Sequence, residues 1–407
     1  MEFTEQQQRV IAHDHKKNGV VRAGPGTGKS LTVVALAQRL AADHPDVQIR
    51  FVTFTRAATS ELIKKIISAG GKNLKPSTIH SFATSVLMQN QDALPTQLPL
   101  RIPSDYEQDK IIYPYIGRVL GIRSTRVKKM VQAMASMWES LDPDFSFADI
   151  TATDKARFIA AFQNASRLYG FTLLSQLPDL LRRLLTEHTD VKGLNFQFLI
   201  IDEFQDLNKC EIELLKQLNG RGIAVLAVGD EDQSIYSFRK AHPIGIREFE
   251  NHFSAAVAYD LSICHRCPGN LMLWAQHVIQ GDLTRSARPT PECLSDTVAE
   301  TKLLHFPGET SEAKGVAALI AKLIGKGMAA HEVLVLTRYD DKERFSKKIK
   351  ELLTEKEIPV FDSKETKKLL DDKNVRLLFA YLRLLNDGKD SLAWQTLART
   401  IFMQNEG

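Results

Sequence analysis

The fold is decided by residues 20–30, which read Val20-Val21-Arg22-Ala23-Gly24-Pro25-Gly26-Thr27-Gly28-Lys29-Ser30. An apolar run comes first, a glycine-rich turn follows, and Lys-Ser leads into a helix-forming segment. A strand delivers the backbone to such a loop, where N–H groups and the positive end of the next helix surround phosphate charge. This order predicts a site for a nucleoside triphosphate.

The flanking residues extend this prediction to a βαβ unit. Apolar residues recur at helical spacing after the loop, and residues 47–54 form the next apolar run. Lys29 would reach the β- and γ-phosphates and Ser30 would hold Mg²⁺, while Ala23 stands where the G-x-x-x-x-G-K-[ST] pattern usually has glycine. We expect Mg²⁺ and either ATP or GTP to bind at Ala23, Gly24, Pro25, Gly26, Thr27, Gly28, Lys29 and Ser30.

Two adjacent carboxylates stand far downstream of the loop. The apolar run at 198–201 ends in Asp202 and Glu203. Asp202 can complete the Mg²⁺ shell, and Glu203 can orient or deprotonate the attacking water. A kinase transfers the phosphoryl group to a bound acceptor, whereas an ATPase has to activate water. The second carboxylate therefore favours hydrolysis.

The stretches around these two sites carry a more specific resemblance. In order, they are Phe3-Thr4-Glu5-Gln6-Gln7, the phosphate loop, Thr53-Phe54-Thr55-Arg56-Ala57-Ala58, Thr78-Ile79-His80-Ser81-Phe82, Asp202-Glu203-Phe204-Gln205-Asp206, and Val228-Gly229-Asp230-Glu231-Asp232-Gln233-Ser234-Ile235-Tyr236-Ser237-Phe238-Arg239. A seventh stretch, Leu261–Arg266, matches more loosely. The chain resembles a UvrD/Rep-like superfamily 1 DNA helicase, and this resemblance implies RecA-like α/β lobes that use ATP and Mg²⁺.

The resemblance assigns further residues to the ATP site. Gln7 would bind the adenine edge with its amide, and we favour this role over the alternative that one of three consecutive glutamines is simply at the surface. Gln233 would sense the γ-phosphate or the attacking water and relay that state. Arg239 would pair with an acid near the site, and Arg266 would stabilise transition-state charge as an arginine finger. The expected catalytic residues are Lys29, Glu203, Gln233 and Arg266.

The expected DNA contacts combine aromatic rings with residues near backbone phosphates. Stacking on an aromatic face tolerates every base, which a translocating motor requires. The alternative is that these rings fill the protein core. The stacking residues would be Phe54, Tyr236 and Phe238, and the phosphate contacts would come from Thr55, Arg56 and His80. The basic cluster at 123–129 would either contact a phosphate backbone or form a solvated helix face.

Length and composition fit a protein of several domains. A chain of 407 residues with 43% apolar residues can bury two or more cores. The net charge of +4 permits a polyanionic partner without demanding one. We find no long apolar run and no secretion signal, so we expect a cytoplasmic location and no membrane contact. Four cysteines argue against a disulfide scaffold.

The apolar pattern predicts a discontinuous first domain. Residues 1–88 and 191–260 would form one RecA-like parallel sheet, with a helical insertion at 89–190 between them. A partial second RecA-like lobe would follow at 261–386, and a second insertion domain would start at 387–407. The expected strands are 20–23, 49–54, 198–202, 223–228, 333–336 and 358–361. The expected helices include 341–355, 375–385 and one that buries Phe158, Ala161, Phe162, Ala165 and Tyr169 before Gly170.

Two departures from the family pattern affect these expectations. His265 replaces the aromatic that usually precedes the motif arginine, which puts adenine stacking from that side in question. Cys264-x-x-Cys267 is compatible with metal or redox chemistry, but the sequence offers no second close pair of cysteines. After residue 340 nothing resembles the two downstream motifs of the family, one of which supplies another arginine. We therefore expect these 407 residues to bind Mg·ATP and to hydrolyse it weakly or not at all by themselves.

The function expected from the sequence is ATP-dependent movement on single-stranded DNA, with a 3′ to 5′ direction implied by the resemblance. Duplex and single-strand junctions are the expected substrates, and a protein partner in a repair, replication or defence complex is compatible with the pattern. Two alternatives stay open at this point. The chain could be a nucleotide-gated DNA-binding module with little turnover, or it could act on RNA.

Overall fold

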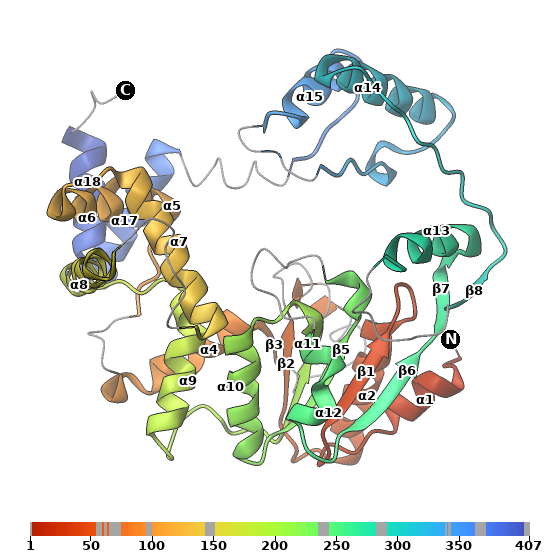
Figure 1. The fold of residues 1–407 in the computed structure, drawn as a ribbon, viewed down its shortest axis with the longest axis horizontal. Coiled ribbons are helices and arrows are strands. Elements are labelled where there is room, and N and C mark those ends of the chain that lie inside the picture. Colours follow the sequence, from red (N-terminus) through yellow and green to blue (C-terminus); the bar gives the residue numbers. More distant parts are fainter. Residues whose placement is uncertain are drawn as a thin grey trace. The chain divides into compact units, whose positions relative to one another are not determined.

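The computed structural model describes residues 2–53, 59–60, 63–64, 75–94, 100–142, 151–234, 244–281, 291–337, 340, 343–362 and 372–402. Its central feature is a six-stranded parallel sheet in the order β3-β2-β4-β5-β1-β6 (Figure 1). The strands are β1 Gly19–Ala23, β2 Ile49–Thr53, β3 Lys75–Thr78, β4 Phe198–Ile201, β5 Ala224–Gly229 and β6 Val257–Leu261. Residues on both sides of the insertion thus contribute to one sheet, as the apolar runs predict.

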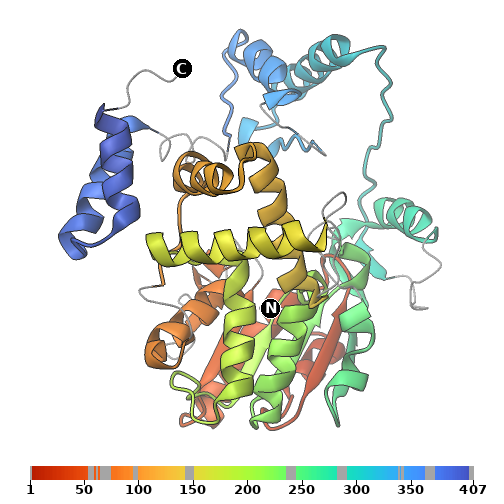
Figure 2. The same ribbon diagram turned by 60° about the vertical axis from the view of Figure 1, so that its left-hand side comes forward.

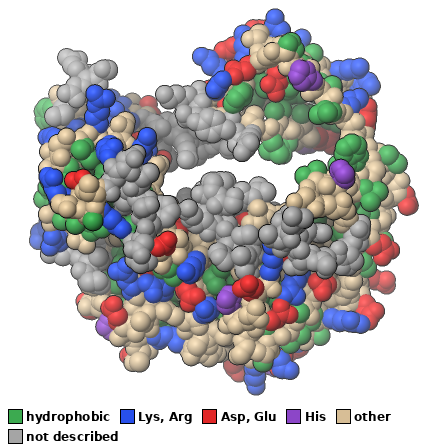
Figure 3. All heavy atoms as spheres, viewed as in Figure 1, with side chains coloured by type: hydrophobic (Ala, Val, Ile, Leu, Met, Phe, Trp, Pro, Cys, Tyr) green, Lys and Arg blue, Asp and Glu red, His purple; other side chains and the backbone are tan. Residues whose placement is uncertain are grey.

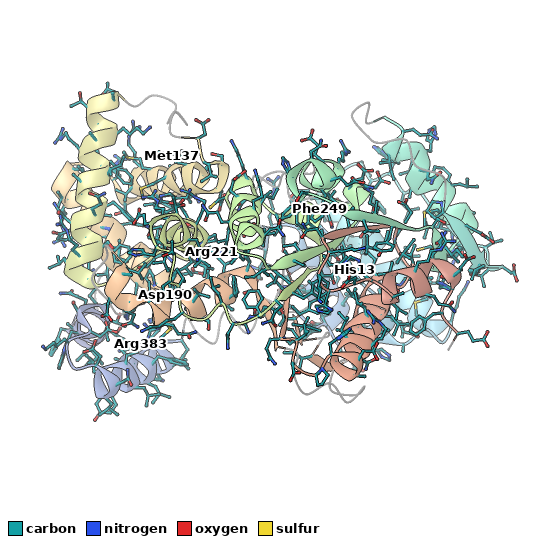
Figure 4. All side chains as sticks on the ribbon, turned by 90° about the horizontal axis from the view of Figure 1, so that it is seen from below. His13, Met137, Asp190, Arg221, Phe249 and Arg383 are labelled. Atoms are coloured by element: carbon teal, nitrogen blue, oxygen red, sulfur yellow. The ribbon has the colours of Figure 1, made fainter. Side chains whose placement is uncertain are left out.

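The inner strands are apolar along their whole length because the sheet is covered on both faces. All residues of β4 and β5 are buried, which is typical of parallel strands between two helical layers. Leu199 and Ile201 face one core, and Phe198 and Ile200 face the other. Figure 4 shows Phe249 and His13 on these two opposite sides of the sheet.

Different helices cover the two faces. One core includes residues of α4 Ile79–Gln89, α9 Leu177–Glu187, α10 Lys209–Gly220, α11 Ile244–Arg247 and α12 Phe249–His252. The other core is covered by α1 Glu5–Ile11 and α2 Lys29–Asp43, whose Leu36 and Leu40 are fully buried. Short helical turns at η1 Gln91–Ala93, η4 Phe204–Asp206 and η5 Glu231–Gln233 connect these elements. The observed α/β architecture is consistent with the RecA-like fold that the sequence predicts.

The insertion is helical and has a core of its own. It contains α5 Asp105–Glu107, η2 Gln108–Ile112, α6 Tyr113–Leu120, α7 Ser124–Ser140, α8 Ala152–Tyr169 and η3 Leu174–Gln176. The predicted stripe from Phe158 to Tyr169 is buried, and α8 ends at Gly170 in the left-handed conformation. Both confirm the prediction for this helix. The insertion meets the sheet's helices where α7 contacts α10 (Figures 1 and 2).

The chain after β6 forms smaller elements. Two parallel strands, β7 Ile263–Pro268 and β8 Glu292–Ser295, pair beside α13 Gly269–Ile279. Residues 300–379 form a separate compact unit, in which α14 Glu309–Gly325 packs on α15 Ser346–Thr354; η7 Ala330–Glu332 lies between these two helices in the chain. The predicted helix at 375–385 is part of α17 Lys373–Asn386. Finally, α18 Ser391–Phe402 contacts α8, and its Leu392 joins the insertion core.

Several predicted elements need correction. The strands expected at 333–336 and 358–361 are irregular segments, and the helix expected at 341–355 begins only at Ser346. Leu336 and Phe361 are 81% and 84% exposed. A strand needs a neighbour to pair its backbone groups, and the described residues of the unit at 300–379 contain no strand. Strands β3 and β6 were not predicted, because both lie at sheet edges and lack a continuous apolar run.

No described helix combines the length and apolar character that crossing a membrane requires. The division of the chain into the five segments given above remains a prediction.

Candidate functional site

The predicted site residues gather at one edge of the sheet. The phosphate loop follows β1, Asp202 and Glu203 follow β4, and Asp230 follows β5. These three strands are neighbours and run parallel, so their carboxyl ends lie at the same edge. Ligands of open α/β sheets bind at this edge.

The phosphate loop has the backbone shape that its glycines allow. Gly26 and Gly28 have φ of 70° and 82°, in the left-handed region. A Cβ on Gly26 would lie 2.7 Å from the Arg266 Cβ, so no other residue fits without moving β7. Thr27 Oγ1 donates to Gly24 O over 2.9 Å, and Lys29 Nζ donates to Ala23 O over 3.2 Å. These bonds hold the loop as a compact turn.

The first turn of α2 faces the same loop. Its N-cap is Gly28, which supplies no side-chain cap. The first amides of a helix have no intrahelical partner and attract anions. Lys29 and Ser30 are the first two residues of this helix and are half-buried. The arrangement suits a phosphate group with an adjacent cation.

Two glutamines hold helix α1 in place, Gln7 at the loop and Gln6 at Ser262 between β6 and β7. Gln7 is 5% exposed; its Nε2 donates to Thr27 O over 3.1 Å, and its Oε1 accepts from the Thr4 N–H over 3.0 Å. Gln6 exchanges two hydrogen bonds with Ser262, of 2.8 and 2.9 Å. The Gln7 amide therefore positions the loop, and it would have to exchange these partners to bind adenine. Gln6 was missed because nothing in the sequence pairs it with the distant Ser262.

The two acids differ in their surroundings. Asp202 is buried, and its Oδ1 accepts from the Glu203 N–H over 3.0 Å. Glu203 is half-buried and has φ of 56°, a conformation that costs a non-glycine residue about 1 kcal/mol or more. Its Oε2 accepts from Gln205 Nε2 over 2.8 Å. The two carboxylates thus accept from different donors, Asp202 from the Glu203 backbone and Glu203 from the Gln205 amide.

A chain of hydrogen bonds joins Glu203 to Gln233. Gln205 Oε1 accepts from the Asp230 N–H over 3.0 Å, and Gln233 Nε2 donates to Asp230 Oδ2 over 2.7 Å. A Cβ on Gly229 would lie 2.3 Å from Gln205 Oε1, so this contact requires glycine there. We call Glu203, Gln205, Asp230 and Gln233 the coupling network; Asp230 joins it through its backbone N–H and its carboxylate. Gln205 and Asp230 were not predicted, although both stand within the matching sequence stretches.

Strand β7 brings Arg266 to the loop. The His265 N–H donates to Gly26 O over 2.9 Å. Arg266 is exposed, with its Cβ beside Gly26 as described. The structure thus collects Lys29, Ser30, Gln7 and Arg266 around one loop. Arg239, the remaining nucleotide candidate, lies outside the described residues.

Most predicted DNA contacts cannot be placed. Phe54, Thr55, Arg56, Tyr236 and Phe238 lie outside the described residues. His80 is half-buried in the first turn of α4, directly after β3 at the same sheet edge. It lines a cavity of about 720 Å³ between the insertion and the sheet unit.

The charged residues that line this cavity help to choose between the two interpretations of the basic cluster at 123–129. Its charged lining groups are mainly acidic and include Asp105, Asp109, Glu139, Asp206 and Glu211. Lys128 forms an ion pair with Asp109 over 3.0 Å. This pairing favours the solvated-face interpretation for Lys128, because its charge is directed to a carboxylate.

Comparisons with known proteins cover nearly the whole chain. The family model of the UvrD/REP helicase N-terminal domain matches residues 3–254, and that of the UvrD-like helicase C-terminal domain matches residues 259–405. The first match alone extends over more than half of the chain.

Curated relatives agree with these matches. The chain is 26% identical to the ATP-dependent DNA helicase UvrD1 of Mycobacterium tuberculosis, over 97% of this chain and 54% of the relative. It is 26% identical to DNA helicase II of Haemophilus influenzae, over 97% and 55%. It is 24% identical to the ATP-dependent DNA helicase Rep of Salmonella typhimurium, over 94% and 58%. The chain spans about half the length of these relatives, and it belongs to the UvrD/Rep helicase family.

Proposed function

We propose that this chain binds Mg·ATP at the phosphate loop and couples its hydrolysis to movement on single-stranded DNA. The observation that carries this proposal is the coupling network. It connects a carboxylate beside the nucleotide loop to Gln233, which stands three residues before Tyr236 in the stretch expected to contact DNA. The relatives' names as ATP-dependent DNA helicases support the same function.

Nucleotide binding would use the loop and the start of α2. The left-handed glycines and the uncapped helix start fit a triphosphate, and Lys29 would leave Ala23 O to meet its charge. Ser30 and Asp202 would hold Mg²⁺, the ion that neutralises phosphate charge. Gln7 would recognise adenine, and Arg239 would complete the site.

Hydrolysis would depend on Glu203 as the group that orients or deprotonates water. Gln205 fixes one carboxylate oxygen of Glu203, which leaves the orientation of the second oxygen well defined. Gln233 would report the state of the γ-phosphate through Asp230, and Arg266 would stabilise developing negative charge from β7. His265 occupies the place of the usual adenine-stacking aromatic, and its backbone holds Gly26 instead.

DNA binding would depend on contacts of individual residues and not on a strongly positive surface. On the face shown in Figure 3, basic and acidic side chains are interspersed over the part that contains the sheet, and the net charge is only +4. Phe54, Tyr236 and Phe238 would stack on bases, while Thr55, Arg56 and His80 would lie near phosphates. We propose single strands and their junctions with duplex as the substrate and 3′ to 5′ as the direction of movement.

Two substitutions, measured in a binding assay and a hydrolysis assay, test the roles of Lys29 and Glu203 separately. Lys29→Ala should weaken binding of a fluorescent ATP analogue, because Lys29 meets ground-state phosphate. Glu203→Gln should keep that affinity and lower single-turnover hydrolysis by about 10²–10⁴. Single-turnover conditions detect even weak hydrolysis by these 407 residues. Glu187→Gln, at the exposed end of α9, is the matched control and should match the parent in both assays.

The same measurement can overturn the proposal. Hydrolysis by Glu203→Gln at the parent's rate would show that another group activates water. Stimulation by RNA that equals or exceeds stimulation by single-stranded DNA would reassign the substrate.

A further inference from the structure

Three of the four cysteines meet behind the phosphate loop. Cys264 on β7 is fully buried and is the register partner of Cys293 on β8. The backbone of β7 is irregular after Cys264, so the Cys267 N–H can donate to Cys264 Sγ over 3.3 Å. Cys267 and Cys293 are half-buried. The sequence alone does not indicate this group, because 28 residues lie between Cys264 and Cys293.

We propose that Cys264 and Cys293 form a regulatory disulfide whose formation weakens nucleotide binding at the adjacent loop. Neighbouring strands lie about 4.8 Å apart, and disulfides join residues whose Cα atoms lie about 4.4–6.8 Å apart. Register partners on β7 and β8 therefore meet the requirement on Cα separation. The described residues hold no group of three or more metal-ligating side chains arranged for a metal ion, which favours oxidation over metal binding.

The surroundings of the thiols set how fast this step can run. Burial raises the pKa of Cys267 and Cys293, and the neighbouring Cys264 sulfur adds to the effect. The thiols of Cys267 and Cys293 are therefore mostly protonated at neutral pH, and their small thiolate fraction should react slowly with oxidants. Cys210, the fourth cysteine, is buried in α10, and burial raises its pKa to about 12.

A low-molecular-weight disulfide such as oxidised glutathione is the oxidant that we infer. The thiolate of the accessible Cys293 attacks one sulfur of the glutathione disulfide, which releases one glutathione thiol and leaves a mixed disulfide. Cys264 then attacks the Cys293 sulfur and releases the second glutathione thiol. In total, two protein thiols are oxidised to one disulfide, and one glutathione disulfide is reduced to two thiols.

Both strands touch the loop that the bond would affect. Cys264 Sγ lies 3.0 Å from the position that a Cβ on Gly26 would occupy, and the His265 N–H holds Gly26 O. On the β8 side, the Pro291 ring lies 3.4 Å from the corresponding position on Gly24, and Cys293 Sγ donates to Pro291 O over 3.8 Å. Gly26 thus lies against β7, and Gly24 lies beside Pro291, the residue directly before β8.

A covalent bond between the strands would stiffen this support. We propose that entry of a triphosphate takes Lys29 away from Ala23 O and that the loop adjusts against β7 and Pro291 as this happens. A disulfide would also remove the Cys293 thiol donor from Pro291 O. We expect oxidation to lower the affinity for a fluorescent ATP analogue by about fivefold or more. This consequence rests on the proposed function of the loop, whereas formation of the bond does not.

Peptide mapping of the full chain tests the bond directly. Trypsin cleaves after Arg247, Arg266, Arg285 and Lys302 and skips the Arg288–Pro289 bond, so the three thiols fall into peptides 248–266, 267–285 and 286–302. After incubation with oxidised glutathione, we expect a linked pair of peptides 248–266 and 286–302. Cys293→Ser should abolish this product, and the matched control Cys267→Ser should retain it. Stable glutathione adducts without a link, or a link between 248–266 and 267–285, would overturn the assignment.

Nucleotide titrations of the same samples test the consequence. The oxidised parent should bind the fluorescent ATP analogue more weakly than the reduced parent, and a reductant should restore the affinity. Cys293→Ser should bind equally under both conditions. Equal affinity of the oxidised and reduced parent would refute coupling to the loop. If the reduced parent binds no nucleotide while the disulfide forms, the proposed function of the loop fails and the assigned bond stands.

Discussion

Replacement of Gln205 tests the coupling network quantitatively. Its side chain is 1% exposed, donates to Glu203 Oε2 over 2.8 Å and accepts from the Asp230 N–H over 3.0 Å. Gln205→Met keeps a similar side-chain length and removes both bonds. A hydrogen bond to a charged group contributes about 1.5–3 kcal/mol, and an unsatisfied buried amide costs about 1–3 kcal/mol. Because the two effects overlap, we expect the free energy of unfolding to fall by about 2–4 kcal/mol.

Urea denaturation measures this loss against a matched variant. Gln8 lies on the exposed face of α1, and its Nε2 donates to Phe3 O over 3.0 Å. Gln8→Met should change the free energy of unfolding by no more than about 0.5 kcal/mol. A loss in Gln205→Met that does not exceed the loss in Gln8→Met would show that the network is not formed in the folded protein.

Four single substitutions give further predictions. Gly26→Ala should weaken binding of a fluorescent ATP analogue about tenfold or more, since a non-glycine residue at φ 70° costs about 1–2 kcal/mol and its Cβ would meet Arg266. Burial lowers the pKa of His13 from 6.5, so the parent should lose stability as pH falls below that value, and His13→Gln should lose less in urea denaturation. Phe238→Ala should weaken single-strand binding by about 1–3 kcal/mol in fluorescence anisotropy, and Arg56→Ala should reduce its salt dependence.

The sheet and its loop could be predicted because their signals are local. The runs at 198–201 and 224–229 are buried on both faces, so burial leaves a continuous apolar pattern in the sequence. The loop depends on glycine positions that a sequence displays directly. The amphipathic stripe of α8 was equally readable, because each turn of a helix repeats its buried face.

The errors and omissions have physical causes as well. Residues 333–336 have a strand-like composition, but strand formation depends on a neighbour that an apolar run does not specify. The polar strand β3 contains Pro76, which the edge of a sheet tolerates.

Long-range contacts were the other class of omission. The pairing of Gln6 with Ser262 and of Cys264 with Cys293 depends on which strands meet in space. Residues within one motif could be recognised from the sequence, whereas contacts between motifs required the structure. The roles assigned to the individual site residues remain predictions.

We infer that the nucleotide site and the DNA-binding residues communicate through the coupling network. The effect of each ligand on the affinity for the other tests this inference most directly. We would measure the affinity for a labelled single-stranded oligonucleotide with and without a saturating nonhydrolysable ATP analogue and Mg²⁺. We expect the analogue to change DNA affinity by about fivefold or more and DNA to change analogue affinity by the same factor. We also expect Gln233→Ala to abolish this change while both ligands still bind. The same DNA affinity with and without the analogue in the parent, or an undiminished change in Gln233→Ala, would contradict this inference.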